Sequence, residues 1–358
     1  MSTLSTDPAE DTIVSPAPRS RGWRRPLLAL SVLVVLAALV TSRTDLGSRV
    51  RNPKPAGTHL LQGTPHANAP FLGFSNWPLA FEIFSIIVAV VCYTISIRRS
   101  RREGRWTPTL LLLVATTLIT WLDPVMNWLP YAAYDPRLLH FPESWPWVSL
   151  APTVEPLVIF VGYPYYFLLP AWFTLWFYGR FVADRSWAKA YPLAVIAALS
   201  YVICVVWDFA TETTFVRMEI YCYTQAVPGW SVREGTSWQF PLYESLIFGI
   251  VLAAAPVLMW RDASGQNLCE RVAARGRFAG GVFGGRPLAV AFAIMSLVYL
   301  VGDGLPMGII RITDSASSVA RPWPYQDTKV FDPQNFYRDS GEPGPYMKGV
   351  WSRLDLGR

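Results

Sequence analysis

The stretch PLAFEIFSIIVAVVCYTISI, residues 78–97, decides the fold class of this chain. Glu82 is its only charged side chain. A helix of about 20 apolar residues is long enough to cross the hydrocarbon core of a bilayer. Comparable apolar stretches recur along the chain, and the full set is 26–42, 78–97, 108–130, 154–178, 190–209, 240–260 and 287–305. The sequence therefore predicts an all-α integral membrane protein, built as a bundle of about seven transmembrane helices.

The composition agrees with a membrane protein. Hydrophobic residues make up 52% of the chain and charged residues only 16%, whereas soluble domains carry about 25% charged residues. The mean hydropathy is +0.27. The net charge of +6 comes largely from arginines near the ends of the apolar stretches, which is typical of membrane topology. We therefore expect the lipid bilayer as a partner and no nucleic acid.

Cysteine and histidine usage argues against a metal or redox centre. The four cysteines form no CxxC pair, so neither a zinc ribbon nor a dithiol motif is indicated. The three histidines are His59, His66 and His140, too few for the histidine-rich iron sites of membrane oxidases. We expect no metal and no cofactor.

The distribution of Lys and Arg predicts the orientation. Basic residues concentrate in alternate segments, which are 1–25, 98–107, 179–190 and 261–286. The segments between them, 131–153 and 208–240, are poorer in basic residues. Because basic loops remain on the cytoplasmic side, we expect a cytoplasmic N-terminus and two structured extracytoplasmic loops.

Three regions follow from this topology. Residues 1–25 are expected to be a disordered basic cytoplasmic segment, 26–310 a polytopic membrane domain, and 311–358 an extracytoplasmic tail rich in Pro and aromatic residues. The first apolar stretch follows RGWRR as a signal peptide would, but no clear small-residue cleavage site follows it, so we expect it to stay as a span.

Acidic residues gather near the outer ends of the predicted spans. Counting about 1.5 Å per residue along each helix places one or more in the outer third of every span from the second to the seventh: Glu82, Asp123, Glu155, Asp208, Glu212, Glu244 and Asp303. Ionisable groups at membrane depth usually mark function. We take all of these except Glu82 as candidate catalytic residues.

The helix dipole separates these acids into two groups. Glu82, Glu155 and Glu244 lie near predicted helix N-termini, where a carboxylate is favourable and an ordinary helix-end role would explain it. Asp123, Asp208 and Asp303 lie toward predicted C-terminal ends, where a negative charge is unfavourable. Carboxyl groups crowded in an apolar pocket cannot all ionise, so some are expected to hold a proton and act as general acids.

The loop WLDPVMNWLPYAAYDPRLLHFPESWPWVSLAPTVEP, residues 121–156, is dense in Trp, Tyr and Pro. Seven prolines stiffen it, and we interpret 131–153 as the lid of an apolar pocket. Asp123 and Asn127 would share a helical face if the helix continues past Pro124. The candidate substrate-binding residues here are Asn127, Trp128, Tyr131, Trp145 and Trp147. An ordinary aromatic belt at the membrane interface would also explain the tryptophans.

Two further residues complete the candidate site. His140 is the only histidine beside the acids, so it is a candidate proton shuttle, although a solvated loop histidine is an equally good interpretation. Tyr221 is a candidate hydroxyl donor to the substrate. It lies in FVRMEIYCYT, residues 215–224, whose alternation predicts a strand-like segment packing on the first loop.

WLDPVMNW, residues 121–128, and LLHFPESWPWVSLAPTVEP, residues 138–156, resemble the AveC-type spirocyclase family. The resemblance extends from about the second to the seventh span. It implies a multi-pass protein of the bacterial plasma membrane. It also implies a cyclase of polyketide biosynthesis that closes a dihydroxy-ketone into a spiroketal with loss of water. The family provides no agreed catalytic residue set to transfer to this chain.

Three functions compete. The favoured one is a cofactor-free, membrane-embedded cyclase or dehydratase, which uses acid–base catalysis on a lipophilic polyketide-like substrate. The second is an acid-initiated isoprenoid cyclase or isomerase, in which the aromatic side chains stabilise carbocations. The third is a non-enzymatic lipid-binding protein of the cell envelope, with structural acids. The sequence specifies no oligomeric state.

Overall fold

The computed structural model describes residues 71–74, 76–143, 145–275, 286–325, 328–342 and 344–347. The predicted first span at 26–42, the basic segment 1–25, and His59 and His66 lie outside these residues. The end of the predicted tail, 348–358, lies outside them too.

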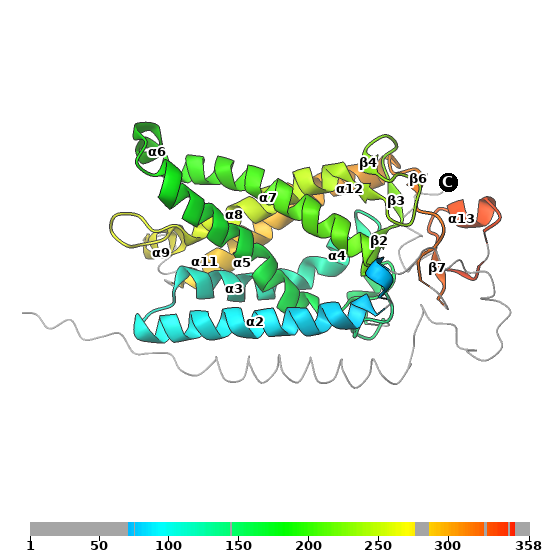
Figure 1. Cartoon of the computed structure of the whole chain (residues 1–358), viewed down its shortest axis with the longest axis horizontal. Coiled ribbons are helices and arrows are strands. Elements are labelled where there is room, and N and C mark those ends of the chain that lie inside the picture. Colours follow the sequence, from blue (N-terminus) through cyan, green and yellow to red (C-terminus); the bar gives the residue numbers. More distant parts are fainter. Residues whose placement is uncertain are drawn as a thin grey trace, which may run out of the picture.

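Long helices run side by side as a bundle (Figure 1), and they are α2 (Trp77–Arg102), α3 (Pro108–Ile119), α5 (Ile159–Phe177), α7 (Pro192–Arg217), α8 (Leu242–Met259) and α11 (Pro287–Tyr299). Two of them continue through a change of helix type. α3 leads through η2 (Thr120–Leu122) into α4 (Asp123–Trp128), and α11 leads through the π-helix η5 (Leu300–Gly304) into α12 (Leu305–Ile312).

Within the described part of the chain, five helices are long and apolar enough to cross a membrane: Trp77–Arg102, Pro108–Trp128, Pro192–Arg217, Leu242–Met259 and Pro287–Ile312. α5 is not among them, because its many Tyr and Trp residues and its two internal prolines, Pro164 and Pro170, make it less apolar. It packs against α2, α3, α7 and α8. The chain thus has the helices of a membrane protein, while the total of seven spans stays a prediction.

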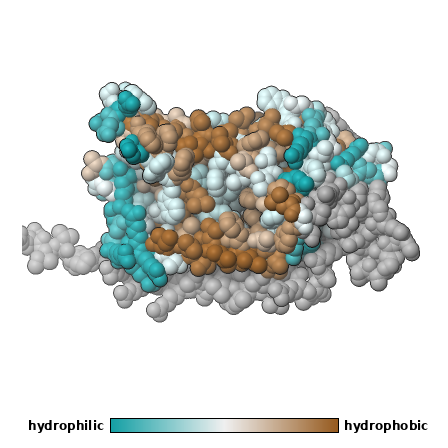
Figure 2. Space-filling model, in the orientation of Figure 1, coloured by the Kyte–Doolittle hydropathy of each residue, from teal (hydrophilic) through white to brown (hydrophobic). Residues whose placement is uncertain are grey.

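The bundle has two polar ends and apolar sides (Figure 2). At one end, which we call the basic end, lie Arg99–Arg105, η4 (Tyr178–Val182), α6 (Ser186–Ala190) and α9 (Leu268–Ala274). Ion pairs cross-link it, including Arg261 to Glu103 at 2.9 Å. The helix flanks between the ends expose apolar side chains such as Ile87, Val206 and Leu297. An apolar belt of this kind suits contact with lipid.

The opposite end, which we call the loop end, carries the short strands. β1 (Ala132–Tyr134) pairs antiparallel with β2 (Tyr221–Tyr223), so the expected strand-like segment 215–224 is extended only over its last residues. The other pairs are β3 (Gln225–Ala226) with β6 (Ser318–Val319), β4 (Ser231–Val232) with β5 (Phe240–Pro241), and β7 (Val330–Phe331) with β8 (Tyr346–Met347). Short helices complete this end, and they are η1 (Phe71–Gly73), η3 (Val148–Leu150) and α13 (Phe336–Asp339).

The C-terminal tail packs on β1 and β2. Trp323, Tyr325 and Tyr337 are buried in one cluster with Ala133 and Cys222. The Tyr325 hydroxyl donates to the Ala133 carbonyl at 2.6 Å. The tail therefore stabilises the two strands that cover the loop end of the bundle. The tail also includes helical residues, since α12 extends to Ile312 and α13 is a short helix.

The structure changes the expected helix position of three acidic residues. α7 continues to Arg217, nine residues beyond Asp208, because its threonine hydroxyls bond back to the helix's own carbonyls, as in Thr213 to Phe209. Asp303 lies inside η5, and the helix continues to Ile312. Asp123 opens α4 and does not close α3. The unfavourable dipole at a helix C-terminus therefore does not apply to these three residues.

The close approach of α7 and α8 depends on Gly249. A Cβ atom built there would lie 2.7 Å from Val205 Cγ2, and the β-branched Val205 cannot turn away easily. We predict that Gly249→Ala lowers the stability by about 1–3 kcal/mol through overpacking, measured as a lower thermal midpoint in detergent. The matched control is Gly179→Ala, where nothing lies within 4 Å of the added Cβ. Equal midpoints for the two variants would refute the packing argument.

Candidate active site

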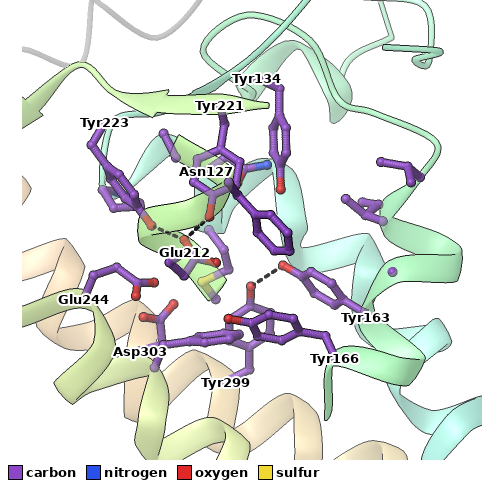
Figure 3. Close-up of a pocket in the computed structure, with 18 of the residues that line it drawn as sticks. Asn127, Tyr134, Tyr163, Tyr166, Glu212, Tyr221, Tyr223, Glu244, Tyr299 and Asp303 are labelled. Carbon is purple, nitrogen blue, oxygen red and sulfur yellow. Dashed lines mark hydrogen bonds between the residues drawn. The ribbon is translucent and has the colours of Figure 1, made fainter. Parts of the chain in front are cut away.

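An enclosed cavity lies at the loop end of the bundle, between the helices and beneath β1 and β2 (Figure 3). Its polar lining consists of carboxyl groups, tyrosine hydroxyls and one amide, from Asn127, Tyr134, Tyr163, Tyr165, Tyr166, Glu212, Tyr221, Tyr223, Glu244, Tyr299 and Asp303. The space open to the centres of water-sized molecules is about 90 Å³. One water needs roughly 10–15 Å³ on this measure, so the cavity has room for several waters or a compact polar group.

Glu212 is held by two tyrosines of the strand that covers the cavity. The hydroxyls of Tyr221 and Tyr223 both donate to Glu212 Oε2, the latter at 3.1 Å. Burial and the nearby Glu212 carboxyl raise the pKa of Tyr221 well above its usual value. Tyr221 therefore stays protonated and acts as a donor over the whole physiological range.

Asp208 lies one helical turn before Glu212 on α7. Tyr166 of α5 donates to Asp208 Oδ1 at 2.7 Å, and the same hydroxyl lies 2.9 Å from Thr211 Oγ1. The Glu244 carboxyl from α8 lies close enough to the Asp208 carboxyl for the two groups to interact electrostatically. Two carboxylates have no proton to share, so this contact is favourable only when one of the pair is protonated.

Several buried carboxyl oxygens have no hydrogen-bond partner among the described residues. They are Asp208 Oδ2, Glu244 Oε2, Asp303 Oδ1 and Glu155 Oε1. A buried polar atom without a partner costs about 1–3 kcal/mol. Bound protons, water or a substrate hydroxyl would satisfy these atoms, and each fits a site that works on hydroxyl and carbonyl groups.

A second acidic pair lies beside the first. Asn127 donates from Nδ2 to Asp123 Oδ2 at 2.7 Å and to Glu155 Oε2 at 3.2 Å. Asp123 and Asn127 thus share a helical face across Pro124, as their spacing predicted. The hydroxyl of Tyr163 donates to Asp123 Oδ1 and lies 2.8 Å from the hydroxyl of Tyr299. Hydrogen bonds therefore run from this pair to the cavity wall.

No Lys, Arg or His is among the described residues that line the cavity. Arg311 of α12 is bound outside this lining: its guanidinium sits 4.1 Å from the Trp128 ring centroid and 4.0 Å from that of Tyr131, and it donates to the Trp128 carbonyl at 2.7 Å. The acids of the cavity are thus balanced by protons and hydroxyl donors. Among the described residues, no group of three or more His, Cys, Asp or Glu side chains could hold a metal ion.

The structure brings most of the predicted acids together, but it does not place every candidate in the cavity. Glu212, Glu244, Asp303, Asn127 and Tyr221 line it, whereas Asp123, Asp208 and Glu155 lie behind its wall through the contacts above. Glu155 precedes α5 and does not open it.

The other candidates lie elsewhere. Trp128 and Tyr131 stack on Arg311, and Trp145 and Trp147 line a separate groove. His140 Nδ1 lies 2.8 Å from the Phe141 carbonyl oxygen, and the ring is not part of the cavity lining. The proton-shuttle role of His140 therefore stays a prediction without a contact to the cavity.

Sequence reasoning missed the tyrosines of the spans. Tyr163, Tyr166 and Tyr299 point their hydroxyls into the acid cluster (Figure 3). Their signal was weak, because tyrosine near a span end is also typical of an interfacial belt. The spacing of Tyr163 and Tyr166 by three residues, which places both on one helical face, could have indicated them.

Burial and the neighbouring Asp123 carboxyl raise the pKa of Glu155 well above its usual value. The folded chain therefore keeps this proton to a higher pH than the unfolded chain does. Stability from this group is fully present below the usual carboxyl pKa and is lost as pH rises through the raised pKa.

We predict that Glu155→Gln reduces the fall of the thermal midpoint between mildly acidic and mildly alkaline pH, because it removes the group that must ionise. Differential scanning fluorimetry of the purified chain across that range measures the slope. Asp184→Asn, at a carboxylate exposed at the basic end, should keep the slope of the unchanged protein. An unaltered slope in Glu155→Gln would count against a protonated Glu155.

Comparison with known proteins identifies the family. The family described as spirocyclase AveC-like matches residues 100–331, which is more than half of the chain and includes all the candidate acids of the site. No curated protein and no solved structure matches the chain. The sequence motifs at 121–156 and this match agree, and the chain belongs to the AveC-like spirocyclase family.

Proposed function

We propose that this protein is a membrane-embedded cyclase that closes a lipophilic dihydroxy-ketone into a spiroketal with loss of one water. Membership of a spirocyclase family suggests the cyclase role. The observation that carries the proposal is the enclosed cavity walled by carboxyl groups and tyrosine hydroxyls, with no basic side chain among its described lining residues. We place the protein in a bacterial plasma membrane, with the bilayer and a lipophilic small molecule as its partners.

The first ring closure requires one acid and one base. A protonated carboxyl donates to the ketone oxygen while the first hydroxyl adds to the carbonyl carbon, and a carboxylate takes the hydroxyl proton. This forms a hemiketal and leaves the number of protons in the site unchanged. Glu212, Glu244 and Asp303 line the cavity, and they can supply one donor and one acceptor.

The second ring closure expels water. The hemiketal hydroxyl is protonated and leaves as water, which gives an oxocarbenium ion, and the second hydroxyl adds to that carbon as a carboxylate removes its proton. Developing positive charge is favoured by nearby carboxylates and aromatic faces. Tyr166, Tyr221 and Tyr299 line the cavity close to these acids, and the cavity has room for the released water.

The walls would also govern the product's stereochemistry. Spiroketals form spontaneously in acid as a mixture of isomers, whereas a cavity that fixes the substrate in one conformation favours one ring fusion. Apolar side chains such as Phe81, Val158 and Phe248 complete the lining. They suit a substrate whose carbon skeleton is largely apolar.

An acid-initiated isoprenoid cyclase is the second candidate, supported by the aromatic rings of Phe81, Phe215 and Phe248 in the lining. The number of buried hydrogen-bonding groups favours the first candidate. An isoprenoid offers few polar atoms to the unpartnered carboxyl oxygens, whereas a dihydroxy-ketone offers three. A lipid-binding protein without activity would bind either molecule and convert neither.

We predict that Glu244→Gln and Asp303→Asn, at two carboxyl groups that line the cavity, each lower the rate of spiroketal formation by about 100-fold or more, the usual contribution of a general acid or base. The assay uses the purified full chain in nanodiscs with a synthetic linear dihydroxy-ketone, and chiral chromatography with mass spectrometry follows a single product isomer. Turnover of an isoprenoid and not of the dihydroxy-ketone would support the second candidate.

Asp184→Asn is the matched control, because it changes the same side chain at the opposite, basic end. It should keep full activity. Thermal midpoints of all three variants separate loss of chemistry from loss of folding. Full activity of both Glu244→Gln and Asp303→Asn would rule out acid–base catalysis by this cluster.

A further inference from the structure

A second hollow lies on the flank of the bundle beside the acidic pair. We call it the tryptophan groove, and its wall includes Trp121, Pro124, Phe141, Trp145, Trp147 and Phe160. Measured in the same way as the cavity, its space is about 370 Å³ against about 90 Å³. The groove is built almost entirely from apolar and aromatic side chains.

The groove opens on the side of a candidate membrane span. Trp121 and Pro124 belong to the span Pro108–Trp128, and the ring centroids of Trp121 and Trp147 lie 5.7 Å apart. The two rings are 48% and 43% exposed, and the Trp147 indole donates to the Trp121 carbonyl. Exposed, fixed tryptophans on the flank of a span are suited to the interface of the bilayer, where a lipophilic molecule dissolves.

Glu155 lies between this groove and the active site. It lines the groove, it is only 2% exposed, and its Oε1 atom has no hydrogen-bond partner among the described residues. Its other oxygen accepts from Asn127, which lines the cavity. The groove and the cavity are thus separated by the hydrogen-bonded set Asp123, Asn127 and Glu155.

We propose that the tryptophan groove binds an apolar, hydroxyl-bearing arm of the substrate, whose hydroxyl group donates to Glu155 Oε1. This inference rests on the proposed cyclase function, since it makes the groove a first binding site for the linear substrate, occupied before its hydroxyl groups and its ketone meet in the cavity. The chemistry of the wall selects this ligand class. Aromatic rings bind the carbon chain, one buried acceptor binds one hydroxyl, and an anionic group would be repelled by the acidic pair.

Photolabelling tests this assignment without turnover. The full chain in nanodiscs is labelled with a diazirine-bearing octanol, and labelled peptides are mapped by mass spectrometry in the presence of decanol or undecane as competitors. We expect labels on the groove segments 120–124 and 145–155, with decanol competing about tenfold better than undecane through its hydrogen bond. Labels confined to the cavity tyrosines, or equal competition by the two molecules, would overturn the proposal.

Two substitutions at one position isolate the hydroxyl contact. Glu155→Gln keeps an acceptor oxygen and should keep the preference for decanol, whereas Glu155→Met removes the acceptor at similar volume and should abolish it. Glu244→Gln, in the cavity, should leave the labelling of the groove unchanged. If decyltrimethylammonium competes better than decanol, the groove is a cation site and the proposal is wrong.

The proposal for the groove and the proposed cyclase function can be contradicted independently of each other. Groove labelling with a decanol preference, in a protein that does not convert the dihydroxy-ketone, would support the groove and contradict the cyclase function. Turnover without groove labelling would support the cyclase function and contradict the proposal for the groove. When turnover is present, Trp147→Ala should raise KM by about tenfold with a smaller change in kcat, because it removes binding and no reacting group.

Discussion

The constraint on which this structure depends is a set of carboxyl groups buried together, with no Lys, Arg or His among the described residues that line their cavity. An isolated carboxylate in an apolar interior is so costly that it takes up a proton or finds donors instead. Here the donors are neutral. Tyr166 donates a hydrogen bond to Asp208, and Tyr221 and Tyr223 donate to Glu212. Asn127 donates to both Asp123 and Glu155. Such donors stabilise charge without cancelling it, so the site retains both acids and bases.

Two helices depart from regular α-helical geometry beside acidic residues of this cluster. Pro124 follows the short η2 turn, so that α4 restarts with Asp123 in its first turn. On the other side, η5 has the wider π-helical turn, and Asp303 projects from it into the cavity. π-helical turns are frequent at functional sites because they turn side chains in directions that a regular helix does not allow. Irregular helix geometry thus positions Asp123 and Asp303 in the acid cluster.

The parts of the fold that could be predicted were those set by the bilayer. The position of Glu244 in a first helical turn follows from counting residues, and the structure agrees. The end of α7 was missed because ATETTFVR is as polar as a loop. Its threonine hydroxyls donate to backbone carbonyls of the same helix. Trp128 and Tyr131 were expected to contact substrate, and instead they enclose Arg311. Sequence pattern places an aromatic ring at a depth, but only packing determines which neighbour it contacts.

The tail that covers β1 and β2 also links the acids to a part of the chain that follows the last helix of the bundle. Tyr325 and Tyr337 pack in one cluster with Ala133 of β1 and Cys222 of β2. A carboxyl group exposed to water is ionised at neutral pH, whereas burial favours its protonated form. The packing of this tail thus contributes to the burial on which the acidity of the site depends, although none of its described residues lines the cavity.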